Sequence, residues 1–199
     1  MSTDAFIIYS TAHISRDEYN SWLHQLNAVM IPEEGGPYDA RLSKDVRHVW
    51  VSLLEGKWFE GDLAEFGEQS EVLEEIKRLI GGDPRSAIAL DANDAEGSKI
   101  LVVQFAALCA ERYPCVVYQA AGEALCTAQD VLELRDAGMG FDGYTWETAD
   151  PNRPSWDTLI VEEIKRQEAA KKQTQQDEVF PFLGGLGRPV EHGGERLGA

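Results

Sequence analysis

Cysteine is scarce in this sequence, and its spacing indicates neither a disulfide nor a metal site. The 199 residues include three cysteines, Cys109, Cys115 and Cys126, which form no Cys-x-x-Cys pair and lie in apolar surroundings. Disulfide frameworks and zinc sites both depend on paired cysteines. We therefore expect three reduced thiols in the core of a cytosolic protein.

Long apolar runs are also missing. A membrane-spanning helix needs about 18 consecutive apolar residues, and the longest run here is far shorter. The N-terminal sequence Met-Ser-Thr-Asp-Ala-Phe has no basic stretch followed by an apolar one, which a secretory signal peptide requires. Both absences predict a cytoplasmic protein that does not enter a membrane.

Basic residues are few compared with acidic ones. The chain has 18 lysines and arginines against 35 aspartates and glutamates, a net charge of −17. Binding to nucleic acid or to an anionic membrane requires a basic patch that neutralises phosphates. The composition therefore predicts no nucleic-acid or membrane partner, and it favours either a basic protein partner or acidity that only keeps the protein soluble.

The acidic residues are concentrated in one part of the chain. Residues 55–96 carry 12 acidic and 4 basic side chains, a net charge of −8, and Trp58 lies near the start of this stretch. An exposed tryptophan with a charged rim is typical of a protein-binding surface, although Trp58 could instead cover a sheet edge. The candidate binding surface comprises Trp58, Asp62, Glu65, Glu68, Glu71, Glu74 and Glu75.

Catalytic and cofactor motifs are absent as well. The sequence contains no Gly-x-Ser-x-Gly, no phosphate loop and no dinucleotide fingerprint, and its four histidines, His13, His24, His48 and His192, show no metal-ligand spacing. We expect no cofactor and no catalytic residue. These absences favour a protein that is not an enzyme, and they leave one alternative open.

That alternative is a metal-dependent enzyme that uses the acidic loop between Asp91 and Glu96. Asp91, Asn93, Asp94 and Glu96 follow an expected strand and precede an expected helix, where ligands of α/β proteins usually bind. The loop does not match an EF-hand, because Val102 occupies the twelfth position, where a glutamate is needed. The other interpretation of these residues is a polar turn whose acids complement the helix dipole.

The segment from Pro84 to Gln119 organises the expected fold. It predicts a strand at 86–90, a helix at 97–113 that is apolar nearly all round, and a strand at 115–119, which together form a βαβ unit. Alternating or apolar patterns and capping residues predict further strands at 5–10 and 46–54, a short strand through 59, and helices at 15–30, 70–80 and 127–137. Residues 33–43 and 60–69 are expected to be loops.

These elements predict an α/β or α+β domain with a mixed sheet and helices packed on it. A ferredoxin-like core with extensions is the leading option. We expect this domain to span residues 1–149, followed by a helix at 150–173 that docks by its first half and could instead serve assembly. Residues 174–199, which are polar and glycine-rich, are expected to be a disordered tail.

The middle of the chain resembles small acidic bacterial toxin-immunity proteins. The resemblance lies in the pattern of Ser86–Asp91, Lys99–Tyr118 and Thr127–Leu132, and it covers roughly 50 residues. It implies a cytosolic inhibitor that binds a cognate toxin tightly and catalyses nothing. Together with the local acidity, it suggests an inhibitor whose acidic surface meets a basic protein.

Overall fold

The computed structural model describes residues 4–32, 37–67, 70–122, 124–150, 153 and 165–166. The chain divides into two units, Met1–Trp156 and Asp157–Ala199, and all the elements below belong to the first. The expected helix at 150–173 and tail at 174–199 fall almost entirely outside the described residues. None of the helices in the described ranges is both long and apolar enough to cross a membrane.

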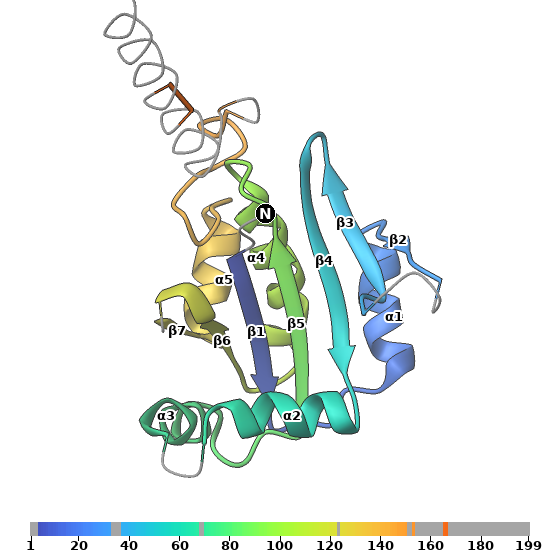
Figure 1. The fold of residues 1–199 in the computed structure, drawn as a ribbon, viewed down its shortest axis with the longest axis vertical. Helices are drawn as coiled ribbons and strands as arrows, with labels where there is room; N and C mark the ends of the chain where they lie inside the picture. The colour runs from blue at the N-terminus through green and yellow to red at the C-terminus, as the bar shows by residue number, and fades with distance from the viewer. Residues whose placement is uncertain are drawn as a thin grey trace, which may run out of the picture. The chain divides into compact units, whose positions relative to one another are not determined.

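The centre of the fold is a four-stranded sheet with two crossover helices. In chain order, the elements of this core are β1 (Asp4–Ser10), α1 (Arg16–Gln25), β4 (Arg47–Leu54), β5 (Ser86–Ala92), α4 (Ser98–Ala110) and β6 (Cys115–Gln119), with other elements between some of them. The strands lie side by side in the order β4-β5-β1-β6 (Figure 1). This βαββαβ order is that of a ferredoxin-like core, so the α+β class and the leading architecture are confirmed.

Short strands extend this core at both edges. The complete described sheet has seven strands in the order β2-β3-β4-β5-β1-β6-β7, where β2 is Val29–Met30, β3 is Ala40–Lys44 and β7 is Ala124–Thr127. Three further α-helices, α2 (Lys57–Glu65), α3 (Glu71–Ile80) and α5 (Ala128–Asp136), and one short 3-10 helix, η2 (Ala120–Gly122), complete the described elements.

The expected βαβ unit is present in a split form. β5 and β6 run parallel to each other and are joined by α4, but β1 lies between them and pairs antiparallel with both. Every pairing between the described strands is antiparallel, so the sheet is not mixed as expected. A crossover helix is still required, because two parallel strands cannot be joined by a tight turn.

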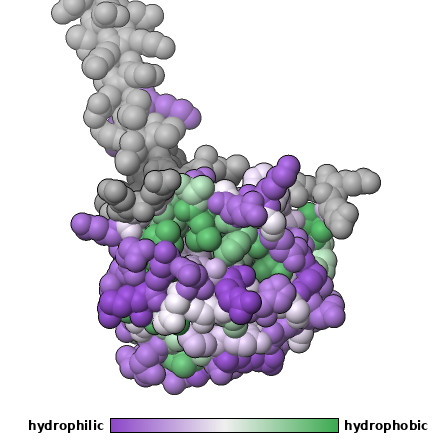
Figure 2. All heavy atoms as spheres, turned by 90° about the horizontal axis from the view of Figure 1, so that it is seen from below, coloured by the Kyte–Doolittle hydropathy of each residue, from purple (hydrophilic) through white to green (hydrophobic). Residues whose placement is uncertain are grey.

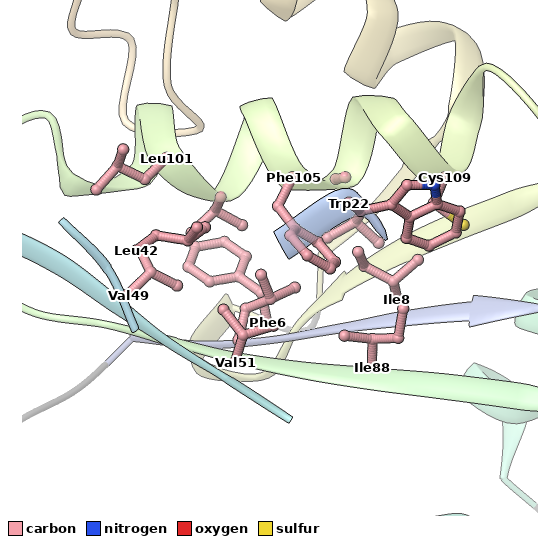
Figure 3. Close-up of a cluster of buried hydrophobic side chains, with 14 of the residues drawn as sticks. Phe6, Ile8, Trp22, Leu42, Val49, Val51, Ile88, Leu101, Phe105 and Cys109 are labelled. Carbon is pink, nitrogen blue, oxygen red and sulfur yellow. The ribbon is translucent and has the colours of Figure 1, made fainter. Parts of the chain in front are cut away.

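α4 is the core helix, as its sequence predicts. Nine of its 13 residues are buried, including Ile100, Val102 and Phe105. The Phe105 ring meets the rings of Tyr19 and Trp22 from α1 edge to face, with centroids 6.0 and 6.1 Å apart. Figure 3 shows Phe105 and Trp22 above the strand residues Ile8, Ile88 and Val51 in one cluster.

The two faces of the sheet differ in how they are covered. Along β4, Val49, Val51 and Leu53 point into the core below α1 and α4, whereas Trp50 and Ser52 point to the opposite face, as their alternation predicts. A second apolar cluster on that opposite face holds α2 and α3 against the sheet. In Figure 1 these two helices cross one end of the strands.

Two predicted boundaries are wrong for local reasons. α1 ends at Gln25 instead of Met30, because Asn27 adopts a left-handed φ of 54° and Val29–Met30 then pairs with β3. The residues from 40 to 43, expected in a loop, belong to β3, which forms a hairpin with β4. The intervening residues 33–36 are outside the described residues.

The stretch from 57 to 65 is a helix, where a short strand and an acidic loop were predicted. Phe59, Leu63 and Phe66 are spaced four and three residues apart and pack together on the second face of the sheet. This helical period was hidden by the glycine and acids between them. Tertiary packing therefore decides the conformation of α2.

Three predicted helix starts are confirmed by their caps. The hydroxyls of Ser15, Ser70 and Thr127 each accept a hydrogen bond from the backbone N–H three residues later. In a capping box the Glu18 carboxylate would accept from the backbone N–H of Ser15, but it accepts from Arg112 and the Tyr113 hydroxyl at 2.9 and 2.6 Å instead. Its charge ties α1 to the end of α4.

Candidate functional site

A polar and aromatic surface lies on the second face of the sheet, beside the end that α2 and α3 cover. Trp50 on β4 and Asp91 on β5 are direct partners across the antiparallel pair. Arg41 on β3 is the partner of Trp50 on its other side. All three side chains are partly exposed. They lie on the same face of the sheet as the apolar cluster under α2 and α3, but they are not part of that cluster.

Aromatic rings gather around Trp50. The Tyr38 ring lies with its centroid 5.5 Å from that of Trp50, and the His48 ring meets Trp50 edge to face at 5.8 Å. The guanidinium of Arg41 lies 5.5 Å from the Trp50 ring centroid, which is a cation–π distance. Trp50 is thus the centre of an aromatic cluster, and His48 packs within it.

A pocket opens between this cluster and α2. It has a volume of about 220 Å³ and is lined by Pro37, Tyr38, Ser52, Leu53, Leu54, Trp58, Ala89 and Asp91. Ser52 and Ala89 face each other across β4 and β5. Because both side chains are small, they leave a depression between the larger residues of the neighbouring rows.

Tyr38 forms one wall of the pocket, and hydrogen bonds to β4 fix the backbone on both sides of it. The Ser52 hydroxyl donates to the Pro37 carbonyl at 2.9 Å, and the Asp39 amide donates to the Val51 carbonyl at 2.9 Å. The Tyr38 hydroxyl donates to Asp91 Oδ2 at 2.5 Å. Burial and the Asp91 carboxylate together raise the pKa of Tyr38 to about 12, so the hydroxyl stays a donor at neutral pH.

Trp58 forms the outer rim of the pocket. It lies in the first turn of α2, which starts directly after β4 through Glu55 and Gly56, and 74% of its surface is exposed. Of the two interpretations of Trp58, an exposed aromatic or the cover of a sheet edge, this exposure fits the first. Figure 2 shows the end of the domain that carries α2 and α3, where hydrophilic residues border an apolar area.

Asp62, predicted on the outer acidic surface, points inward. Its Oδ2 accepts a hydrogen bond of 2.6 Å from the hydroxyl of buried Tyr9. Burial raises the pKa of Asp62, the Tyr9 hydrogen bond opposes this, and the charge of Glu65 adds to it. Asp62 anchors α2 to the sheet, so its assignment to an exposed surface is wrong.

The other predicted acids do not form one unpaired group. Glu65 and Glu71 are exposed, while Glu74 pairs with Lys77 at 2.9 Å and Glu75 with Arg78 at 2.5 Å, both within α3. Glu68 lies outside the described residues. Exposed pairs of this kind are weak, so the carboxylates stay accessible, but their charge is partly compensated.

The loop from Asp91 to Glu96 joins three parts of the fold. Asp91 accepts from Tyr38, and Asn93 bonds to the His48 amide and the Val46 carbonyl, both at 3.0 Å. Glu96 accepts from the Tyr144 hydroxyl, the Asp150 amide and Arg153 at 2.9, 3.1 and 3.0 Å. These side chains are thus engaged with separate partners.

No cation site forms in this loop. Asp94 is half-buried in it, but the described part of the chain contains no group of three or more His, Cys, Asp or Glu side chains that could hold a metal ion. The geometry therefore does not support the metal-dependent alternative. The loop is a polar turn before α4, and the first turn of α4 itself contains no acid.

Sequence reasoning missed Tyr38, Ser52 and Ala89 as pocket residues. Tyr38 lay in an expected loop, and Ser52 and Ala89 carry no chemical signal of their own. The remaining histidines of the described part, His13 and His24, are exposed and lie outside the pocket lining. Comparisons with protein-family models, curated proteins and solved structures found no match.

Replacing Asp62 by asparagine is expected to raise the free energy of unfolding at neutral pH. A buried carboxyl with a raised pKa binds its proton more tightly in the folded state, so its ionisation at neutral pH opposes folding. Asparagine removes this charge and keeps an acceptor for Tyr9. The advantage of Asp62→Asn should shrink as the pH falls and wild-type Asp62 takes up its proton.

Urea unfolding at neutral and mildly acidic pH measures this effect. The matched control is Glu71→Gln, which removes an exposed charge and should change stability little at either pH. A loss of stability in Asp62→Asn at neutral pH would contradict this prediction, because it would show that the hydrogen bond from Tyr9 outweighs the cost of burying the charge.

Proposed function

We propose that this protein is a cytoplasmic binding protein that inhibits a basic protein partner by covering part of its surface. The observation that carries the proposal is the exposure of Trp58 at the rim of a pocket, close to exposed acids of α2. Tryptophan is enriched among the residues that dominate binding energy at protein interfaces.

The charge of the protein supports a basic partner. The net charge of −17 attracts cationic surfaces over long range and accelerates their association. The same charge disfavours nucleic acid and anionic membranes. The resemblance to toxin-immunity proteins adds the type of inhibition: tight binding to a toxin, without catalysis or a cofactor.

The first test identifies the partner and its dependence on Trp58. The protein is immobilised on a support and incubated with cytosol of its native cell. Bound proteins are released by a salt gradient, and the experiment is repeated with Trp58→Ala. We expect one stoichiometric basic protein that is released by salt and whose activity the wild-type protein inhibits. Trp58→Ala should weaken its binding by at least about 30-fold, the scale of an interface hot spot.

Two controls make the result specific. Val46→Ala removes another exposed apolar side chain, on the β3–β4 turn, and should leave the affinity unchanged. Glu65→Lys combined with Glu71→Lys should lower the affinity and its salt dependence, whereas Glu147→Lys should change both less. A partner that binds wild-type and Trp58→Ala equally would refute this surface.

A further inference from the structure

We propose that the pocket between Tyr38, Trp58 and Asp91 takes one arginine side chain of the partner. This inference rests on the proposed function and names the group that the binding surface recognises. The pocket lies at Trp58, the residue with the largest exposed fraction among the exposed large apolar side chains of the described ranges.

The size of the pocket suits a single side chain. Sites for drug-sized ligands usually have volumes of about 300–1,000 Å³, and this pocket has about 220 Å³. Its floor is low because Ser52 and Ala89 oppose each other across β4 and β5. A long, narrow side chain that enters from the Trp58 rim would meet Ala89 at the floor and Asp91 at the wall.

The chemistry of the walls suits a cation that is also flat. Tyr38 and Trp58 supply aromatic rings, Leu54 supplies apolar contacts, and Asp91 is the charged residue of the lining. A guanidinium stacks on aromatic rings and forms hydrogen bonds with a carboxylate at the same time. A lysine ammonium is a strongly hydrated point charge and gains less from a flat aromatic wall.

Asp91 is held in place for such a contact. Its Oδ2 accepts from the Tyr38 hydroxyl at 2.5 Å, which fixes the carboxylate. A carboxylate accepts at both oxygens, so Oδ1 is the atom to which an incoming guanidinium would donate. Tyr38 thus combines two roles, as a wall of the pocket and as the residue that positions its charge.

The aromatic cluster next to the pocket already packs against one guanidinium of this chain. Arg41 lies 5.5 Å from the Trp50 ring centroid, and Trp50 is in turn 5.5 Å from Tyr38. Arg41 does not line the pocket, because β4 and its Trp50 separate it from Asp91 on β5. The charge inside the pocket is therefore that of Asp91, and it selects a cation.

The proposal is tested with N-acetyl-L-arginine amide as the probe, by NMR titration of the full-length protein labelled with nitrogen-15. The neutral control is N-acetyl-L-citrulline amide, which has nearly the shape of arginine without its charge. We expect saturable shifts of the Trp58 indole and Ala89 amide signals, with a dissociation constant on the order of millimolar, as befits so small a ligand. Citrulline amide should bind at least about tenfold more weakly.

Two variants locate the bound probe. Ala89→Leu fills the floor without changing charge, and Asp91→Asn removes the charge but keeps an acceptor for Tyr38. Each should reduce arginine binding at least about tenfold while the remaining spectrum stays that of the folded protein. A second measurement is the affinity of the Asp91→Asn variant for the protein partner, which should fall together with its affinity for the arginine probe.

Each outcome decides for or against the pocket. An absence of saturable shifts, equal binding of citrulline amide, or equal binding of N-acetyl-L-lysine amide would overturn the arginine proposal. If the partner still requires Trp58 in that case, the proposed function stands without the pocket. If arginine binds as expected but no protein partner exists, the proposed function fails and the recognition of arginine remains.

Discussion

Replacing Phe105 by alanine is expected to lower the free energy of unfolding by about 3–5 kcal/mol. Phe105 is fully buried at the middle of α4, and its ring meets Tyr19 and Trp22 of α1 edge to face. The truncation removes a large apolar surface and leaves a cavity that these rings, fixed by their own packing, fill only in part.

Urea unfolding followed by circular dichroism measures this loss. The matched control is Phe141→Ala, because Phe141 stacks on Phe6 at 5.2 Å but is only half-buried. It should lose less stability, since the surface that it removes from water is smaller. Equal losses in the two variants would contradict α4 as the centre of the core.

The position of Phe105 also separates stability from binding. Phe105 lies in the cluster on the α1 and α4 face of the sheet, and the pocket lies on the opposite face. Phe105→Ala should therefore reduce the population of folded molecules without changing the affinity of those that remain folded for the arginine probe.

The central elements could be predicted because their signal is local. α4 is a continuous apolar helix, and β4 alternates residues between two faces, so neither assignment depends on the rest of the chain. The helix caps at Ser15, Ser70 and Thr127 are equally local. Antiparallel pairing across the whole sheet could not be predicted in this way, because it depends on β1 being inserted between β5 and β6.

The candidate site also contains features that the local sequence indicates and features that depend on tertiary structure. The sequence places Trp58 among acids but leaves its exposure open, and the inward turn of Asp62 depends on Tyr9, which is 53 residues away in the chain. The pocket depends on the register that places Ser52 opposite Ala89. A shift of the register by one residue would move the side chains of a strand to the opposite face of the sheet, and no local pattern specifies that register.

Local charges also limit what composition reveals. The acids of residues 55–96 suggested one continuous surface, yet Glu74 and Glu75 are paired with Lys77 and Arg78 one helical turn away. Asp91, counted with the candidate metal ligands, instead lines the pocket. The net charge indicates only the sign of the charge that a proposed partner would carry, whereas the place where it would bind depends on tertiary structure.

Replacing Arg47 by methionine is expected to lower the free energy of unfolding by roughly 2–4 kcal/mol, because buried hydrogen bonds from a charged group are lost. Arg47 is 3% exposed at the start of β4. Its Nε donates to the Glu96 carbonyl at 2.6 Å, and its guanidinium also donates to the Ala149 carbonyl at 3.0 Å. Methionine fills a similar volume and leaves both carbonyls without this donor.

The effect should concentrate in the segment from Met139 to Asp150. This segment packs closely on the start of α4, where a Cβ added at Gly97 would lie 2.9 Å from the Ala149 side chain. The Trp146 ring lies 5.3 Å from the Arg47 guanidinium and 3.6 Å from the Lys44 ammonium. Without Arg47, the amides of this segment should exchange hydrogen faster, and Trp146 emission should shift to longer wavelength.

Lys44→Met is the matched control, because it removes the other cation over Trp146 from an exposed position. It should cost less than about 1 kcal/mol, the scale of an exposed cation–π contact, and leave hydrogen exchange in the segment slow. If both variants loosen the segment equally, its attachment depends on contacts to the Trp146 ring. If only Arg47→Met does, the attachment depends on the two backbone carbonyls, and the loop from Asp91 to Glu96 is a structural junction.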